Sequence, residues 1–212
     1  MMEKLVDAAG ELAGLILGED PERLHHSAAV AARARVLAIS VPPSAVDTLV
    51  AAAWLHDIGY GAPARDSGFH PLDGGMYLRR EGWPEDVCAL VAHHSGSRFV
   101  ASVLGLDDRL REFQFVEDPV SDALTVADNS VGPNGTIVAM DERLREKLTR
   151  HGPDSPNARA NPERDDYIRA ADRRVAHRLA TLDVDDHFGE SSLADAAEPS
   201  RPSFHTDPKL DA

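Results

Sequence analysis

The chain contains almost none of the alternating apolar pattern that marks β-strands, and this feature restricts its possible folds more than any other. The single strand candidate, GTIVAM at residues 135–140, has no partner run with which to pair. Apolar residues recur at helical spacing between proline and glycine breaks. We therefore expect an all-α fold with helices over roughly 20–40, 44–59, 71–81, 84–95, 97–113, 119–129, 141–151 and 162–182.

Local signals predict where the first of these helices begin and end. Asp20 followed by Pro21 predicts an N-cap and a proline at the first helical position. Ser44 with Asp47 (S-x-x-D) predicts the start of the next helix, and Gly59 predicts its C-terminal cap. The stretch GYGAPARDSGF, residues 59–69, then predicts a loop rich in glycine, proline and aspartate.

Length and composition predict one domain with a tail. With 212 residues and 42% hydrophobic side chains, the chain can bury one core, which we place in residues 1–182. Residues 183–212 carry eight acidic side chains and three prolines, against only Arg201 and Lys209. Because such a segment buries little apolar surface, we expect it to be disordered.

The net charge of −14 argues against binding to a nucleic-acid backbone, which requires a basic surface. Apolar runs are all shorter than the roughly 18–20 residues of a membrane span, and the first residues lack the basic start of a signal peptide. The single cysteine, Cys88, excludes an internal disulfide and fits a reducing compartment. We therefore expect a cytoplasmic protein, whose oligomeric state the sequence leaves open.

Two aspartates stand where an acid is unfavourable. Asp57 follows the apolar helix LVAAAWL, and Asp128 ends the apolar run of DALTVADNS. A carboxylate at a helix C-terminus opposes the helix dipole at a cost of about 0.3–1 kcal/mol, and burial without a cation costs more. Six of the ten histidines lie between residues 25 and 94. A shared metal ion explains both observations.

Periodicity leaves the first histidine ligand open. His26 shares a helix face with Val30, Ala34 and Leu37, but apolar residues also flank His25, so the pattern does not separate the two. Neutral imidazole with carboxylate suits Fe, Mn, Zn, Co or Ni, and the lack of paired cysteines excludes a structural zinc finger.

Five motifs in order, RLHHSAAVA, LHDIGYG, FHPLDGGMYL, VAHHSG and TVADNS, resemble the HD-domain superfamily of metal-dependent phosphohydrolases over residues 20–130. The resemblance implies a compact helical bundle, and its H-S-x-x-V pattern selects His26 over His25. It implies one or two divalent ions (Mn, Fe, Co, Ni or Zn), with Asp57 bridging the ions where there are two. The implied metal ligands are His26, His56, Asp57, His70, His94 and Asp128.

The chain also departs from better-known members. Tyr60 stands where many members have lysine, so a lysine role in phosphate binding does not carry over, and we expect Tyr60 to contact substrate. His93 is either a further ligand or a group that transfers a proton. Arg98 is our first candidate for a phosphate contact, and Arg65 and Arg79 are the next candidates.

Three functions are compatible with this reading. The first is hydrolysis of a phosphate ester or anhydride in a small metabolite, with a nucleotide or dinucleoside polyphosphate favoured and Asp57 at the catalytic centre. The second is a di-iron oxygenase that acts on a small substrate, such as a phosphonate. The third is a binding module that holds a metal and has lost catalysis. Intact residues at all six ligand positions argue against the third function.

Overall fold

The structure, a computed structural model, describes residues 3–161 and 163–194. In these residues all regular secondary structure is helical, which confirms the all-α prediction, and GTIVAM contributes only an isolated bridge between Val131 and Ile137. The helices are α1 Glu3–Leu17, α2 Pro21–Leu37, α3 Val46–Leu55, α4 His70–Arg80, α5 Glu85–His93, α6 Ser97–Leu104, α7 Asp107–Leu110, α8 Pro119–Asn129, α9 Met140–His151, α10 Pro156–Ala160 and α11 Glu163–Ala194.

The N-terminal caps follow the sequence in one case and differ in another. The Asp20 side chain accepts a hydrogen bond from the backbone N–H of Arg23 at the start of α2, as predicted. The prediction for Ser44 is wrong, because a 3₁₀ turn at Pro43–Ala45 precedes α3 and no side chain caps that helix. Pro43 occupies the first position of the turn, where its fixed φ favours the tighter geometry.

Gly59 is not a helix cap. Helix α3 already ends at Leu55, and Gly59 lies in a 3₁₀ turn, Ile58–Tyr60, that packs against the start of α4. A Cβ on Gly59 would overlap the carbonyl oxygen of His70 and lie 2.7 Å from the backbone nitrogen of Gly74. Glycine is therefore required here for close approach of two backbones rather than for a left-handed conformation.

The predicted helix over 97–113 is divided into α6 and α7. Gly105 adopts a left-handed conformation with φ of 71° and closes α6, as glycine commonly does at helix ends. Helix α10, Pro156–Ala160, was not predicted.

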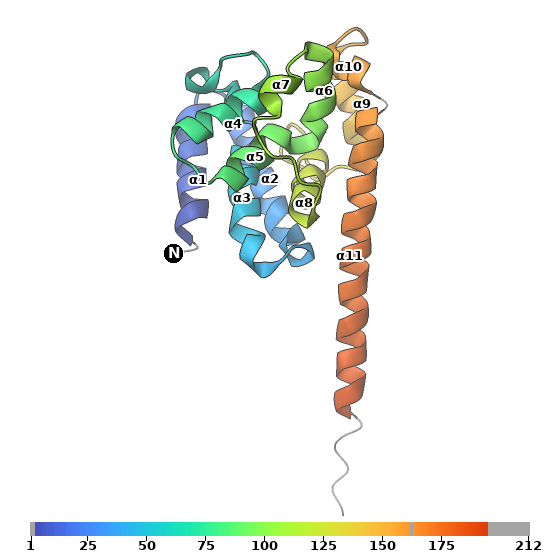
Figure 1. Ribbon diagram of the computed structural model, residues 1–212. Helices are drawn as coiled ribbons and strands as arrows, with labels where there is room; N and C mark the ends of the chain where they lie inside the picture. Colours follow the sequence, from blue (N-terminus) through green and yellow to red (C-terminus); the bar gives the residue numbers. More distant parts are fainter. Residues whose placement is uncertain (1–2, 162, 195–212) are drawn as a thin grey trace, which may run out of the picture.

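Helix α3 lies at the centre of the bundle, in contact with α1, α2, α5 and α8 (Figure 1). Its residues from Leu49 to Ala53 and Leu55 are buried, and the run of three alanines, 51–53, leaves room for neighbouring helices. Because α3 is surrounded in this way, the residues that follow Leu55 begin deep inside the molecule. The sequence HD at positions 56–57 is placed there.

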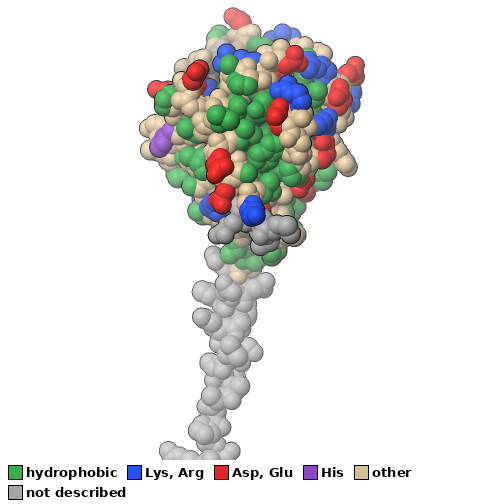
Figure 2. Space-filling model, turned by 90° about the vertical axis from the view of Figure 1, so that its left-hand side faces the viewer, with side chains coloured by type: hydrophobic (Ala, Val, Ile, Leu, Met, Phe, Trp, Pro, Cys, Tyr) green, Lys and Arg blue, Asp and Glu red, His purple; other side chains and the backbone are tan. Residues whose placement is uncertain are grey.

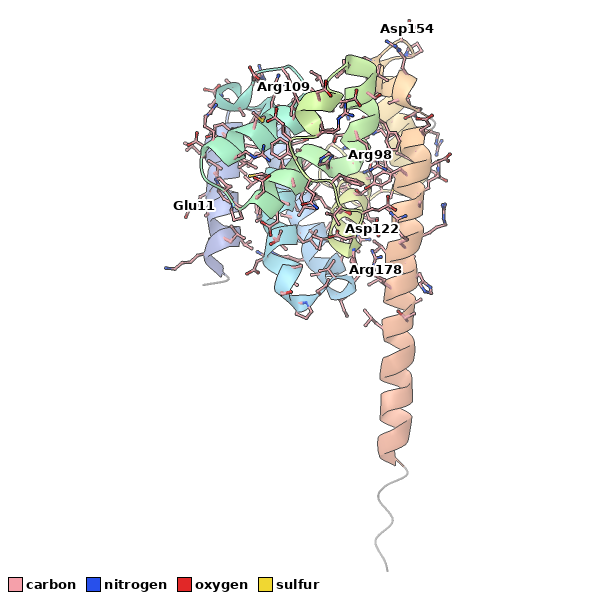
Figure 3. All side chains as sticks on the ribbon, in the orientation of Figure 1. Glu11, Arg98, Arg109, Asp122, Asp154 and Arg178 are labelled. Carbon is pink, nitrogen blue, oxygen red and sulfur yellow. The ribbon has the colours of Figure 1, made fainter. Side chains whose placement is uncertain are left out.

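Helix α11 is held against α8 by a buried carboxylate. Asp122 of α8 is 1% exposed and accepts hydrogen bonds from Arg174 and Arg178 of α11, at 2.9 and 3.0 Å to its Oδ2 (Figure 3). The helix continues to Ala194, into the segment 183–212 for which composition predicts a disordered tail. Residues 195–212 lie outside the described residues, and the tail stays a prediction.

The outer surface is mixed in character. On the side of α1, apolar side chains gather across the middle of the face among charged ones (Figure 2). Leu15 of α1, for example, is 78% exposed. None of the helices in the part of the chain that the structure describes is both long and apolar enough to cross a membrane.

Candidate metal centre

Six side chains predicted as metal ligands converge from separate elements at the centre of the bundle. They form two groups, and within each group the potential ligand atoms all lie within 4.8 Å of one another. The first ligand group comprises His26 of α2, His56 after α3 and Asp128 of α8. The second ligand group comprises Asp57 after α3, His70 of α4 and His94 after α5.

The two groups adjoin through neighbouring residues. In the first group, Oδ1 of Asp128 lies 3.2 Å from Nε2 of His26 and 3.8 Å from Nε2 of His56. The Nε2 atom of His56 also lies 3.6 Å from Oδ1 of Asp57, which belongs to the second group. Asp57 therefore lies between the two groups, where its carboxylate could contribute to ions bound by either one.

The second group is equally compact. Oδ1 of Asp57 lies 3.3 Å from Nε2 of His70 and 4.0 Å from Nε2 of His94. The Nε2 atoms of His70 and His94 are 3.4 Å apart. Three atoms of ligand type thus lie within 4.0 Å of one another.

Backbone carbonyls fix the orientation of three histidine rings. The Nδ1 atoms of His26, His56 and His94 lie 3.1, 2.8 and 2.7 Å from the carbonyl oxygens of Gly132, Ala53 and Val91. An Nδ1–H that donates to a carbonyl leaves the lone pair on Nε2, directed at the centre. In the described part of the chain, the buried Nε2 of His56 has no hydrogen-bond partner. A metal ion would satisfy this atom.

Electrostatics keep both carboxylates ionised. Burial alone would raise the pKa of Asp57, but His56, His70 and Arg23 lower that pKa well below its ordinary value. Burial likewise raises the pKa of Asp128, and neighbours led by Lys147 outweigh this effect.

Histidine pKa values move in the sense that metal binding requires. Burial, with the nearby His56 and His70, lowers the pKa of His94 from 6.5 to about 3, and burial also lowers the pKa of His70. Neutral imidazoles and ionised carboxylates are the forms that bind metals. The six residues therefore fit one or two divalent ions in their donor atoms, orientation and charge.

The centre opens into a cavity of about 510 Å³ that five cationic and four acidic side chains line. Arg23 donates to Oδ2 of Asp57 at 2.7 Å, and its guanidinium lies 3.5 Å from the centre of the Tyr60 ring. Lys147 donates to Oδ2 of Asp128 at 3.0 Å. Arg23 and Lys147 thus each pair with a different carboxylate of the centre. The cationic residues that line the cavity are Arg23, Arg143, Lys147, Arg150 and Arg164.

Ser95, at the kink between α5 and α6, forms a hydrogen bond with Oδ2 of Asp128. Its hydroxyl donates to Oδ2 of Asp128 and accepts from Nδ2 of Asn129 at 2.8 Å, while Arg164 Nε donates to its carbonyl oxygen at 2.9 Å. The φ of 51° is unusual for serine, and such backbone strain is typical of functional sites. With Oδ2 occupied, Oδ1 of Asp128 remains for the first ligand group.

Two of the predicted site residues, Tyr60 and His26, lie at the cavity of the centre. Tyr60 lines the cavity and stacks on the His70 ring, with 4.0 Å between ring centres. His25 is exposed, with its Nε2 3.2 Å from the carbonyl oxygen of Asn134, whereas His26 is buried in the centre. The choice of His26 that the resemblance implied agrees with this geometry.

His93 lies outside the cavity of the metal centre. Its Nε2 is 3.0 Å from the carbonyl oxygen of Phe113, and its side chain lines a separate cavity of about 400 Å³ beside α3, α5 and α8. His93 is the last residue of α5, whereas His94 follows it with a non-helical ψ of 149°, and of the two only His94 lines the cavity of the centre. The structure therefore does not support His93 as a proton donor or ligand at the centre.

The predicted phosphate contact at Arg98 is not supported either. Its guanidinium packs against the rings of Phe99, Phe115 and Tyr167, at 4.3–4.6 Å from their centres, and does not line the cavity. Arg65 donates to the carbonyl oxygen of Tyr60, and Arg79 pairs with Glu85. None of these three arginines lines the cavity of the centre.

The basic residues that do line the cavity were missed, because most of them follow the five motifs. A usable signal existed in α9, where Arg143, Lys147 and Arg150 recur at the spacing of one helix face.

Comparison with protein families gave one finding: the family model described as HD domain matches residues 23–176. The match includes α9 and α11 as far as Ala176, so it extends beyond the five motifs. The comparison with curated proteins gave no match, and neither did the comparison with solved structures.

Proposed function

The chain belongs to the HD domain family, and on that premise we propose that it is a metal-dependent phosphohydrolase that cleaves a phosphate ester or anhydride of a small metabolite. We propose a nucleotide or dinucleoside polyphosphate as the preferred substrate. The observation that carries the proposal is the lining of the cavity: five cationic side chains stand against four carboxylates, in a chain whose net charge is −14. Two of the carboxylates, Asp57 and Asp128, belong to the ligand groups, so divalent ions bound there would make the cavity clearly positive. Such a cavity attracts anions.

The residues of the centre have distinct roles under this proposal. Divalent ions bound by the two ligand groups would polarise a phosphoryl oxygen and lower the pKa of a bound water. Arg23 and Lys147, each beside a carboxylate of the centre, would neutralise charge that develops on the phosphoryl oxygens. Tyr60 would pack against the substrate while its stacking on His70 keeps that ring in place.

Phosphate release without oxygen is the direct test. Purified protein is stripped of metal, reloaded with Mn²⁺ and incubated anaerobically with nucleoside phosphates and dinucleoside polyphosphates. We expect phosphate release from at least one substrate. Turnover that requires both iron and oxygen, with no phosphate ester cleaved, would instead support an oxygenase with the same ligands.

Two neighbouring histidines provide a matched control for the centre. His26→Ala removes a ligand from the first group and should reduce both bound metal and activity by more than about tenfold. His25→Ala changes an exposed ring one residue away and should leave both unchanged. Equal effects of the two substitutions would contradict the assignment of His26.

A further inference from the structure

One face of α9 carries three cations toward the cavity. Arg143, Lys147 and Arg150 are spaced by four and three residues, which places them on one side of a helix, and all three line the cavity. Arg145 lies on another side, is exposed, and donates to the carbonyl oxygen of Asp141 within the same helix. Three of the four cationic side chains named on α9 are therefore directed at the cavity.

Arg143 has an unused donor inside the protein. The residue is only 3% exposed, and its Nη1 donates to Glu146. Within the described residues, its buried Nε atom has no hydrogen-bond acceptor. That atom has almost no accessible surface, so an anion in the cavity would be bound by the part of the Arg143 guanidinium that lines it.

The acidic neighbours do not neutralise this face. Glu146 serves both Arg143 and Arg150, with its carboxylate 3.5 Å from Nε of Arg150. Lys147 pairs with Asp128, a residue of the first ligand group. Glu146 offsets only one of the two arginine charges, so one positive charge on this face remains unpaired. The charge of Lys147 is offset separately by Asp128.

The position of the two arginines separates them from the ligand groups. Lys147 contacts Asp128, while Arg143 lies about one helical turn (~5.4 Å) before Lys147 and Arg150 about one turn after it. Arg23 and Lys147 already stand at the centre, where a reacting phosphoryl group would bind. Arg143 and Arg150 are left for a different anionic group of the same ligand.

We propose that Arg143 and Arg150 form a second anion subsite, which binds a phosphoryl group other than the one at the metal centre. This proposal rests on the proposed phosphohydrolase function and narrows it: the substrate carries at least two phosphoryl groups, as a nucleoside diphosphate or a dinucleoside polyphosphate does. A simple phosphomonoester leaves the subsite empty.

The subsite can be tested without metal. Inorganic phosphate is titrated calorimetrically into the metal-free, full-length protein, because the unloaded carboxylates repel the anion from the centre. Charge-assisted hydrogen bonds predict that Arg143→Gln and Arg150→Gln each weaken binding by about tenfold or more. Arg145→Gln, on another side of α9, should leave it unchanged. Wild-type affinity in both subsite variants would overturn the proposal.

Kinetics of the Mn²⁺-loaded protein then test whether the subsite serves a second phosphoryl group. The two variants should raise KM for a nucleoside diphosphate by about tenfold and leave KM for the matching monophosphate within about twofold. An equal increase for both substrates would overturn the role as a second subsite. If no phosphate compound is hydrolysed, the proposed function fails, and the titration still decides whether the subsite exists.

Arg143 is buried, so its variant is checked by thermal melting before use. Arg150, whose side chain is 46% exposed, can be replaced with little effect on folding. If Arg143→Gln does not fold, wild-type phosphate affinity in Arg150→Gln overturns the proposal.

Discussion

Replacing Gly59 with alanine should separate the turn at Ile58–Tyr60 from the start of α4. The new Cβ would overlap the carbonyl oxygen of His70 and lie 2.7 Å from the backbone nitrogen of Gly74. Both neighbours are backbone atoms, so no side-chain rotation relieves the contact. To restore ordinary van der Waals distances, the two segments must move apart by roughly 1 Å, as overpacked sites do.

The expected magnitude follows from this contact. Overpacking typically costs about 1–3 kcal/mol, and rigid backbone on both sides puts Gly59→Ala at about 3 kcal/mol. For a chain of this size, that loss lowers the melting temperature by roughly 6–12 °C. The same movement withdraws His70, whose Nε2 is 3.3 Å from Asp57, from the second ligand group. Bound metal should therefore fall from about two ions per chain toward one.

Thermal melts followed by circular dichroism, together with elemental analysis, measure both effects. Gly14→Ala is the matched control, because a Cβ on Gly14 of α1 meets nothing within 4 Å. Alanine in a helix interior should stabilise the protein by about 0.5–1 kcal/mol. If Gly59→Ala melts within about 2 °C of wild type and keeps its full metal content, the close-packing argument is refuted.

Three further predictions concern metal, packing and the thiol. Chelator treatment should lower the melting temperature by several degrees and Mn²⁺ should restore it, because metal that binds only the folded state stabilises that state; an unchanged melt in protein without bound metal would contradict the site. Asp122→Ala should cost about 1–3 kcal/mol, measured by urea unfolding, since it leaves Arg174 and Arg178 without their shared carboxylate, whereas Arg80→Ala at an exposed pair should cost little. Burial raises the pKa of Cys88 to about 11, so the folded protein should resist iodoacetamide at pH 8 until it is unfolded. The stability of the folded protein should also fall as pH rises past the ordinary thiol pKa of 9, because the thiol ionises first in the unfolded chain.

Residues whose role depends on local sequence were the predictable ones. The all-α class followed from periodicity, and Asp20 caps α2 as its position before a proline indicates. The electrostatically unfavourable placement of Asp57 and Asp128 at helix ends indicated a metal centre. In the structure, each of the two aspartates belongs to one of the two ligand groups. In each case, the signal lies within a few residues of the one that it describes.

Residues whose role depends on distant packing were not predictable in this way. Arg98 follows a motif closely, but the aromatic rings of Phe115 and Tyr167 hold it away from the cavity. Lys147 reaches the centre only because α9 packs beside α8, and no local pattern shows that neighbour. Gly59 looked like a cap because its true neighbours, the backbones of His70 and Gly74, lie across a loop.

The ligand groups and the basic face of α9 come from successive parts of the chain, residues 26–128 and residues 143–150. Of the three cations on that face, only Lys147 touches a ligand-group residue. Under the proposed function, mutations at positions 143 and 150 would change which anion is bound without altering the carboxylates and imidazoles of the ligand groups. Such a protein would acquire new substrates through changes in one helix while the residues proposed for its chemistry stay the same.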